Sequence, residues 1–555
     1  MADDIAKAGR VERMEAVVIL KEGRDALLDA LLPNRRVLRR LRAQWGNAGD
    51  KADTSASRLF DLTHGMSQNG VVDDQTWHDL EFPRLFADLD TTRTPIGSQV
   101  LYRQLRCPPS SEDAALRYAS SRTLRDAAQL RETLQLQLSA LDTESSRDLA
   151  RFVFGSPPPV EGYQRWLPLW SIGCVLALIA VFAQAVPWWL LLLTVGVNLL
   201  LILRFSTSLF RDIELLKGCN RLQRVAGALA STPDAATPLP QLTRLRSEAA
   251  LRRRIRRSLG WVSILYSPWV QSVAIWLNLL CLAELAAYAR TVTRFERVRA
   301  ELAATFESVG DVDAAIAVAS YLVYRPHHCA PSITSRPLLD IVDGAHPLIA
   351  QPVTNNLRLD GCSALITGSN MAGKTTCIKL VGINVVFARA LGVCFATRAT
   401  LPDTGVMAVI RGEHSVESGR SHYFAEMRAI GSFLEHAERG SCRLFLIDEL
   451  FNGTNTVERL AAGRAVLERL AAHGQVLVTT HDVELQDDID GPFDLYFFQE
   501  DPDVEGWFDY RLRPGRTDRR NAIALLARHG FPADVVDHAR RYSTLYDTPR
   551  QRAPA

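Results

Sequence analysis

The segment best equipped for chemistry is residues 368–375, which read Gly-Ser-Asn-Met-Ala-Gly-Lys-Thr. They form a complete G-x-x-x-x-G-K-[ST] phosphate-loop pattern between a strand-like apolar run, 363–367, and a helix-like stretch, 376–391. The glycines let backbone N–H groups point at phosphate oxygens. Lys374 is expected to reach the β- and γ-phosphates, and the Thr375 hydroxyl to hold Mg²⁺. The pattern predicts a nucleoside triphosphate site whose binding residues are Gly368, Ser369, Asn370, Met371, Ala372, Gly373, Lys374, Thr375 and Thr376.

Two further strand-like runs end in side chains that a hydrolase needs. The apolar run 444–447 is followed by Asp448 and Glu449, and the run 475–480 is followed by His481. Asp448 is expected to hold the metal, and Glu449 to orient and deprotonate the attacking water. His481 is expected to sense the γ-phosphate or hold the water, although a histidine at this place could also be an ordinary loop residue. The order of these residues predicts hydrolysis at a magnesium site.

These motifs resemble those of the MutS family of DNA mismatch-repair ATPases. Residues 367–376 are similar to that family's T-G-P-N-M-x-G-K-S-T, with Ser369 in place of proline. Residues 418–427 resemble S-G-x-S-T-F-x-x-E-M, residues 448–456 resemble D-E-L-G-R-G-T-S-T, and residues 479–482 resemble A-T-H-Y. The resemblance implies ATP and Mg²⁺ as cofactors.

The resemblance also implies a catalytic role for Ser421. In the MutS family the serine of S-G-x-S reaches the γ-phosphate bound by the opposite subunit. Carried over to Ser421, this implies a homodimer with two composite ATPase sites. The alternative for Ser421 is a helix N-cap.

Weaker resemblance extends upstream, to the family's helical core domain. Residues 89–97 are similar to its L-D-x-T-x-T-x-x-G pattern, and residues 310–360 to its return towards the ATPase domain. The similar parts cover about residues 75–150 and 300–545. The family's mismatch-reading domain, with its Phe-x-Glu wedge, has no counterpart in the residues before the core. Direct mismatch recognition is therefore not expected, and DNA remains a candidate partner.

An uncharged apolar stretch interrupts the helical region. Residues 166–203 contain no charged side chain over 38 positions, which suits two membrane-spanning helices of roughly 20 residues each. Basic residues on both flanks, Arg165 and Arg204, place both ends in the cytoplasm by the positive-inside rule. We therefore expect a transmembrane hairpin, the lipid bilayer as a partner, and a multi-pass protein of the bacterial inner membrane with its ATPase domain facing the cytoplasm. The alternative is a buried soluble hairpin, and the third apolar stretch, 261–289, is expected to be an interfacial or core helix.

Composition agrees with a multidomain chain. The 555 residues are 47% hydrophobic and 23% charged, the net charge of +2 excludes no partner, and the nine cysteines have no zinc-type spacing. The expected fold class is multidomain α plus α/β, with a helical core and lever domain, an inserted transmembrane hairpin and an ABC-type P-loop ATPase domain. The expected divisions are a helical segment and linker at 1–74, the core at 75–330 with its hairpin at 166–203, the ATPase domain with dimerisation helices at 331–545, and a disordered tail at 546–555.

Four functions remain open on these residues. The leading hypothesis is a membrane-anchored MutS-like ATPase whose nucleotide cycle moves the helical core, with DNA as a candidate substrate. A DNA-repair or recombination factor tethered to the inner membrane, which clamps duplex DNA, is the first alternative. A membrane ATPase of ABC type is the second alternative, although the chain has no L-S-G-G-Q segment. An interaction scaffold that uses ATP only as a switch is the third. Basic clusters at 35–42 and 252–257 could contact nucleic acid or anionic headgroups.

Overall fold

The chain divides into two compact units, each built from separated segments. The computed structural model describes residues 33–51, 54–63, 70–155, 166–234, 237–256, 276–369, 371–410, 422–451, 455–481, 484–489, 492–500, 508–516, 523, 526 and 530–547. The helical unit comprises Met1–Met66, Phe86–Gln104 and Leu116–Pro326. The α/β unit comprises Ser67–Leu85, Leu105–Ala115 and His327–Ala555. Short segments before residue 116 therefore belong to the α/β unit, although most of that unit follows residue 326.

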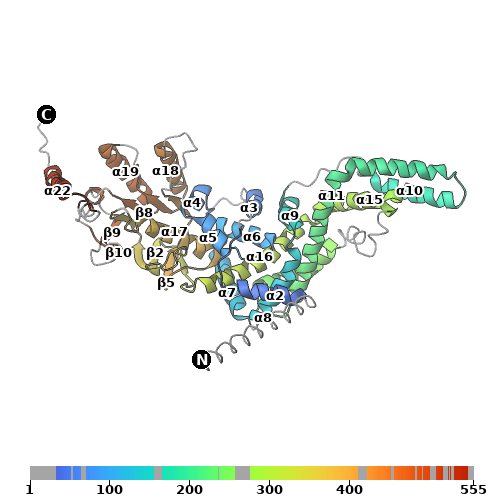
Figure 1. Ribbon diagram of the computed structural model, residues 1–555, viewed down its shortest axis with the longest axis horizontal. Helices are drawn as coiled ribbons and strands as arrows, with labels where there is room; N and C mark the ends of the chain where they lie inside the picture. The colour runs from blue at the N-terminus through green and yellow to red at the C-terminus, as the bar shows by residue number, and fades with distance from the viewer. Residues whose placement is uncertain are drawn as a thin grey trace, which may run out of the picture. The chain divides into compact units, whose positions relative to one another are not determined.

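The helical unit is built around one long buried helix, α16 (Arg299–Tyr324), which is buried along most of its length. Apolar side chains such as Ile96, Leu134, Leu149, Leu216 and Leu242 join Leu302 and Phe306 of α16 in one core. The other helices of this unit in the described residues are α2 (Pro33–Gln44), α3 (Arg58–Thr63), α8 (Ala128–Leu138), α9 (Glu144–Phe154), α10 (Leu167–Phe182), α11 (Trp189–Ser231), α12 (Pro240–Ser247) and α15 (Ala283–Phe295) (Figure 1). Three helices contain residues of both units: α5 (Phe82–Leu89), α6 (Pro95–Arg106) and α7 (Ser111–Asp126).

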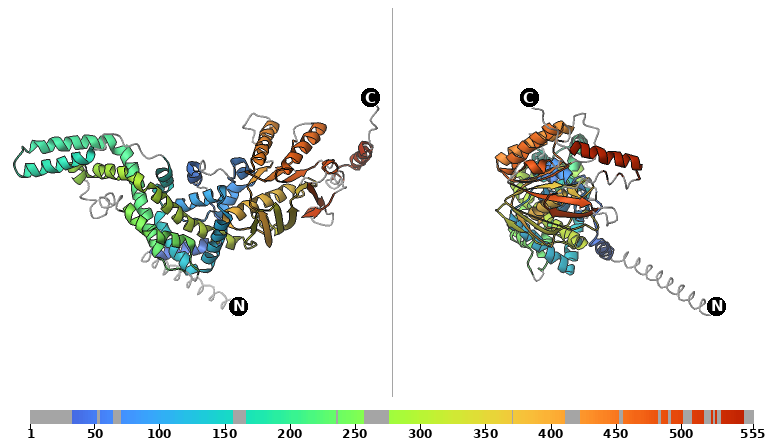
Figure 2. Two further views of the ribbon diagram at one scale, coloured as in Figure 1. Left: turned by 180° about the vertical axis from the view of Figure 1, so that it is seen from behind. Right: turned by 90° about the vertical axis from the view of Figure 1, so that its left-hand side faces the viewer.

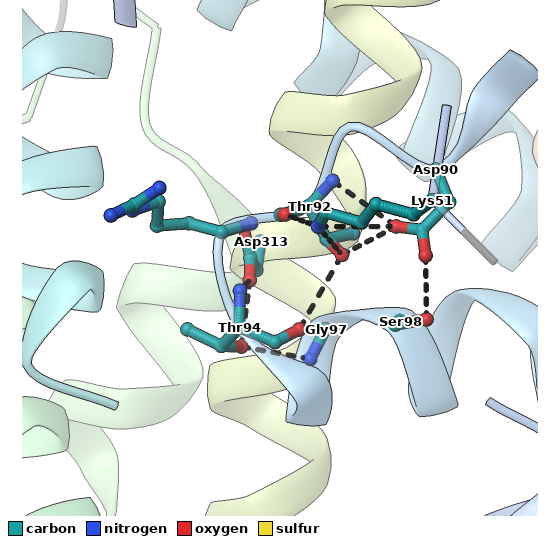
Figure 3. Close-up of polar contacts among 8 residues, drawn as sticks. Lys51, Asp90, Thr92, Thr94, Gly97, Ser98 and Asp313 are labelled. Carbon is teal, nitrogen blue, oxygen red and sulfur yellow. Dashed lines mark hydrogen bonds and ion pairs between the residues drawn. The ribbon is translucent and has the colours of Figure 1, made fainter. Parts of the chain in front are cut away.

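A buried carboxylate of α16 fixes the turn before α6 (Figure 3). Asp313 accepts hydrogen bonds from the backbone N–H groups of Arg93 and Thr94, both at 2.8 Å, and from the Thr94 hydroxyl at 2.7 Å. The Thr94 hydroxyl in turn accepts a hydrogen bond from the N–H of Gly97. Burial raises the pKa of Asp313, and these donors oppose that effect because they favour the charged carboxylate. The turn and α16 are therefore held together by a fully hydrogen-bonded polar group.

A second carboxylate, Asp90, lies on the other side of the same turn (Figure 3). Asp90 accepts hydrogen bonds from the Ser98 hydroxyl at 2.6 Å and from the Thr92 hydroxyl. The ammonium group of Lys51 lies 3.9 Å from Asp90 Oδ1 and also donates to the Thr92 carbonyl. The segment 89–97, which resembles a family pattern in sequence, is thus a tightly organised polar turn.

The apolar stretch 166–203 forms a helical hairpin that packs against a third segment. Helices α10, α11 and α15 lie side by side (Figures 1 and 2). The indole N–H of Trp170 donates to Oδ1 of buried Asn198 at 2.9 Å, and Asn198 Nδ2 donates to the carbonyls of Leu279 and Leu280. Large apolar side chains on both hairpin helices, including Leu176 and Leu200, are exposed.

The predicted transmembrane hairpin is wrong. No helix in the described part of the chain combines the length and the apolar character needed to cross a membrane. Helix α10 has 16 residues, about 24 Å at a rise of about 1.5 Å per residue, whereas the hydrocarbon core of a bilayer is about 30 Å thick. Helix α11 reaches Arg204 after 15 residues and continues as a polar helix to Ser231. The inner-membrane location is therefore wrong too, and the bilayer is not supported as a partner through residues 166–203.

The α/β unit contains two sheets. The larger sheet has the strand order β10-β9-β4-β8-β7-β6 and is parallel except for its antiparallel edge strand β10. Its strands are β4 (Ser363–Thr367), β6 (Val406–Val409), β7 (Leu444–Asp448), β8 (Gln475–Thr480), β9 (Phe493–Glu500) and β10 (Phe508–Pro514). The smaller sheet, in the order β1-β5-β2-β3, contains β1 (Ser332–Thr334), β2 (Leu338–Gly344), β3 (Asn355–Asp360) and β5 (Arg398–Pro402). The described helices of this unit are α4 (Asp74–Asp79), α17 (Lys374–Leu391), α18 (His422–Glu438), α19 (Thr456–Ala471), α20 (Leu485–Asp488) and α22 (Ala533–Asp547).

The register of the three central strands brings their carboxyl ends together. Every residue of β4, β7 and β8 is buried, as expected for the continuous apolar runs of a parallel sheet. Thr367 pairs with Thr480, and Asp448 pairs with Thr479. Residues that follow these strands therefore meet at one edge, where ligands bind in open α/β sheets.

Helix α4 closes the outer edge of the larger sheet. The Thr76 hydroxyl accepts a hydrogen bond from the N–H of Ala408 at 3.0 Å, and Asp79 Oδ2 accepts one from the N–H of Ile410 at 2.9 Å. These acceptors take the place of a further strand beside β6, so its edge N–H groups are not left without partners.

Candidate active site

The phosphate loop has a backbone that requires glycine. Gly368 has φ 143° and Gly373 has φ 104°, and both values lie in the region that side chains disfavour. A Cβ atom at Gly368 would lie 2.8 Å from the carbonyl oxygen of Phe498, so close approach to β9 also excludes a side chain. Met371 adopts φ 71° and projects into solvent, while Ala372 is buried. Asn370 lies outside the described residues.

The loop opens directly into α17, with Gly373 at the N-cap and Lys374 at the first helical position. Thr375 and Thr376 follow in the first turn, where the N-terminal N–H groups and the helix dipole favour an anion. Cys377 in the same turn is fully buried, and burial raises the pKa of its thiol to about 12. The first turn therefore presents hydroxyl and N–H donors and a thiol that stays neutral.

Lys374 is held beneath the loop. Its side chain is buried, and Nζ donates to the carbonyl oxygens of Gly368 at 2.7 Å and Ser369 at 3.0 Å. Nζ also lies 3.3 Å from Nδ1 of His481. The ammonium group is thus pre-positioned at the centre of the loop by two carbonyls and an imidazole.

Thr375 and Asp448 form the candidate metal-binding pair. The Thr375 hydroxyl donates to Asp448 Oδ2 at 2.8 Å, and the Thr479 hydroxyl donates to Asp448 Oδ1. Hydroxyl and carboxylate oxygens are the hard ligands that Mg²⁺ prefers, and a phosphate-bound Mg²⁺ takes only one or two protein groups. The oxygen atoms present therefore fit Mg²⁺ carried by a nucleotide.

Glu449 occupies a strained position just after β7. Its φ of 57° is the left-handed conformation, which costs of order 1 kcal/mol for a residue with a side chain. Its N–H donates to the carbonyl of Thr479, and Oε1 lies in hydrogen-bonding contact with Nε2 of His481. His481 therefore contacts Glu449 through one ring nitrogen and Lys374 through the other. Strained backbone at a strand end, aimed at a polar cluster, is typical of functional sites.

Ser369 adds a donor that the structure leaves free. Its hydroxyl oxygen is buried and has no hydrogen-bond partner among the described residues. A buried polar group without a partner is costly, and it suits a position where a phosphate oxygen binds. Ser369 therefore contributes a hydroxyl where the MutS pattern has proline.

The structure brings together Lys374, Thr375, Asp448, Glu449 and His481, all five predicted from sequence. Ser421 is not among the described residues, which resume at His422, the start of α18. Helix α18 is tied to the segment after β7, because Glu426 Oε1 accepts a hydrogen bond from the N–H of Phe451.

The sequence did not single out Tyr510 as a site residue. Tyr510 of β10 is exposed over 45% of its surface, and a Cβ atom built at Gly373 would lie 3.4 Å from its ring. Phe498 of β9 lies 3.6 Å from the same point. The antiparallel pairing of β9 and β10 places these rings beside the phosphate loop. No local sequence signal marks this contact, because it depends on where the edge hairpin joins the sheet.

The chain is similar to known proteins over part of its length. Residues 364–546 match the family model described as MutS domain V. The chain is 32% identical over 291 residues to the DNA mismatch repair protein MutS 1 of Halobacterium salinarum, covering 47% of this chain and 33% of that protein. It is 30% identical over 263 residues to the DNA mismatch repair protein MutS of Desulfitobacterium hafniense, covering 44% and 30%. It is 33% identical over 257 residues to the Endonuclease MutS2 of Pelotomaculum thermopropionicum, covering 44% and 32%.

The chain spans about a third of the length of the curated relatives it matches. The match to MutS domain V includes the phosphate loop, Asp448 at the end of β7 and His481 after β8. This match and the relatives show that part of the chain is similar to proteins of the MutS family.

Proposed function

We propose that this chain is a MutS-type ATPase that binds and hydrolyses MgATP. The observation that carries the proposal is the linked set Lys374–His481–Glu449 beside the Thr375–Asp448 pair, at the carboxyl ends of β4, β7 and β8. ATP turnover by the purified chain, measured with and without Mg²⁺, tests it directly. A chain that binds no nucleotide with Lys374 intact would contradict the proposal.

Each residue has a defined task in this mechanism. The loop N–H groups and the Ser369 hydroxyl bind phosphate oxygens, and Lys374 offsets charge that develops on the γ-phosphate. Thr375 and Asp448 hold Mg²⁺, which supplies further charge neutralisation to the phosphates. Glu449 takes a proton from the attacking water, and His481 orients the carboxylate through their contact.

Tyr510 extends the proposal to the nucleobase. Its half-exposed ring lies against the phosphate loop at Gly373, and a flat aromatic surface beside a phosphate site can stack on a base. The edge strand β10 would thereby contribute to ATP affinity without taking part in the chemical step.

A homodimer with composite sites is part of the proposal, with Ser421 acting on the nucleotide of the partner subunit. Mixed dimers provide the test: Lys374→Ala and Ser421→Ala should each be inactive alone. In mixed dimers the Ser421→Ala subunit keeps an intact phosphate loop and receives Ser421 from its partner. Random mixing should restore about a quarter of wild-type turnover, because half the dimers would have one working site. Ser421 acting within its own subunit predicts no recovery.

DNA is the proposed partner, since the relatives are a DNA mismatch repair protein and an Endonuclease MutS2. ATPase rates measured with homoduplex, mismatched and branched DNA distinguish between the roles that these two kinds of relative suggest for this chain. Stimulation by mismatched DNA above homoduplex favours a mismatch-repair role, and stimulation by branched DNA favours another DNA-processing role. Absence of stimulation by all three would contradict the DNA proposal while leaving the ATPase proposal in place.

A further inference from the structure

Two cysteines that are far apart in sequence face each other in the α/β unit. Cys329 lies just after the chain enters this unit at His327, and Cys394 lies just after the end of α17. They form an antiparallel bridge in which each backbone N–H donates to the other's carbonyl, at 2.8 and 3.0 Å. Their side chains lie close enough for each thiol to influence the pKa of the other.

The backbone geometry is close to what a disulfide needs. Residues in a hydrogen-bonded antiparallel pair have Cα atoms about 5.5 Å apart, inside the range of about 4.4–6.8 Å found for disulfides. The Cβ atoms of such a pair are further apart than in the neighbouring non-hydrogen-bonded register. A bridge at this position would therefore be somewhat strained, and strained disulfides are the readily reduced, regulatory ones.

The two thiols differ in burial and in pKa, so that Cys329 is suited to attack a reagent and Cys394 to resolve the mixed disulfide. Cys329 is half-buried, and the neighbouring Cys394 side chain and the Ala399 backbone lower the pKa of its thiol. Cys394 is fully buried, and the neighbouring Cys329 side chain together with burial raises the pKa of its thiol. A half-exposed cysteine with stabilised thiolate is the one that a reagent reaches first.

We propose that Cys329 and Cys394 are a redox-sensitive pair that forms a reversible disulfide. The oxidant is a small-molecule disulfide. The Cys329 thiolate attacks one of its sulfurs, so that a mixed disulfide forms and the other half leaves as a thiolate. Cys394 then gives its proton to that thiolate, and its sulfur attacks the Cys329 sulfur and releases the second half as a thiolate. That thiolate takes from solvent the proton that Cys329 released on ionising, so the pair loses two electrons and two protons and the reagent is reduced to two thiols.

The bridge would act on the helix that carries the phosphate loop. Cys394 Sγ donates to Oδ1 of Asn384 at 3.3 Å, and the same Oδ1 accepts the N–H of Phe395 at 2.6 Å. Asn384 lies in the middle of α17 and is fully buried. Oxidation removes the thiol donor from Asn384 and ties the end of α17 covalently to the entering segment, so the redox state of this pair reaches a helix of the ATPase fold.

The experiment uses the full chain, reduced and then equilibrated in buffers of increasing oxidised glutathione. After acid quenching and alkylation, mass spectrometry of the non-reduced digest should show the peptides of Cys329 and Cys394 linked, and dithiothreitol should separate them. In Cys329→Ser no link and no mixed disulfide should form at this site. In Cys394→Ser the mixed disulfide on Cys329 should accumulate instead. Glutathione held on wild-type Cys329 without transfer to Cys394, or no reaction at either thiol, would overturn the proposal.

Cys362 provides the matched control, since it is also half-buried in the same unit. Burial, together with a hydrogen bond to Asp494, raises the pKa of its thiol to about 11. Cys362→Ser should leave the link unchanged. Cys329 should react with a small disulfide about tenfold faster than Cys362, because a larger fraction of Cys329 is thiolate. The lower nucleophilicity of a low-pKa thiolate limits this gain. Equal rates at the two thiols would remove the attacking role from Cys329.

Discussion

The Thr375 hydroxyl, at the start of α17, donates a 2.8 Å hydrogen bond to Oδ2 of Asp448, at the end of β7. The two residues are distant in sequence, and the register of the sheet makes them neighbours. Asp448→Asn should keep this hydrogen bond while removing the negative charge that attracts Mg²⁺. We expect ATP turnover to fall by about 10²-fold or more and the Mg²⁺ concentration at half-maximal rate to rise, since metal clamping supplies much of the catalysis. Thermal unfolding should change little. Unchanged Mg²⁺ dependence would remove Asp448 from the metal site.

Tyr510 should affect ATP binding and leave the chemical step alone. Tyr510→Ala is expected to raise KM for ATP by about fivefold with kcat unchanged, since an aromatic stacking contact contributes about 1 kcal/mol. Tyr510→Phe keeps the ring and should behave like the wild type. Steady-state kinetics of both variants distinguish stacking from a role for the hydroxyl, which would make Phe as harmful as Ala.

Gly97 is expected to be intolerant of a methyl group. A Cβ atom at this position would lie 2.3 Å from Oδ2 of Asp313, the buried carboxylate that holds the turn before α6. Gly97→Ala should therefore lower the free energy of unfolding by about 2–3 kcal/mol, as expected for overpacking.

Gly227 of α11 is the control for that substitution, because nothing lies within 4 Å of a Cβ atom there. Gly227→Ala should stabilise the protein by up to about 1 kcal/mol, since alanine favours a helix over glycine. Chemical denaturation of both variants measures the contrast. Equal effects at the two glycines would mean that the Asp313 network does not constrain the turn.

Asp79 should make the stability of the α/β unit depend on pH. Burial raises the pKa of Asp79 from its ordinary 3.8 to about 6, despite the hydrogen bond from the N–H of Ile410. Between pH 3.8 and pH 6 the folded protein keeps the Asp79 proton, which the unfolded chain has lost. The contribution of Asp79 to the free energy of unfolding is therefore complete below pH 3.8 and is lost as the pH rises through 6.

Asp79→Asn keeps an acceptor for Ile410 and removes the charge. Its free energy of unfolding relative to the wild type should therefore increase by about 2 kcal/mol between pH 4 and pH 7, after allowance for partial solvent access to the carboxyl group. Denaturation curves at pH 4, 5, 6 and 7 measure this difference. A difference that does not vary with pH would contradict the assignment of the raised pKa to Asp79.

Much of the candidate site could be read from sequence because its signals are local. The apolar runs that end in Asp448 and His481 are fully buried parallel strands, and the spacing of Gly368, Gly373 and Lys374 fixes the loop. The side chains meet because parallel strands share one carboxyl edge, which is a property of the fold class and needs no knowledge of long-range contacts.

The wrong prediction and the residues that the sequence did not reveal both depend on contacts between segments that are far apart in the chain. The apolar composition of 166–203 predicts two spans, yet the first helix has 16 residues, and Asn198 is hydrogen-bonded to Trp170 and to carbonyls of a later segment. Tyr510 reaches the phosphate loop only through the β9–β10 pairing, and Asp79 reaches Ile410 only because α4 packs on the edge of β6. Such contacts have no periodic or motif signature in the chain.

Glu449 is the proposed base that activates the attacking water, and its removal should abolish most of the hydrolysis. Glu449→Gln should bind ATP with unchanged affinity while single-turnover hydrolysis falls by about 10³-fold, the usual loss when a general base is removed. Glu435→Gln, at an exposed glutamate of α18 that pairs with Arg439, should hydrolyse at the wild-type rate. Hydrolysis by Glu449→Gln at the wild-type rate, with ATP bound normally, would contradict the central claim.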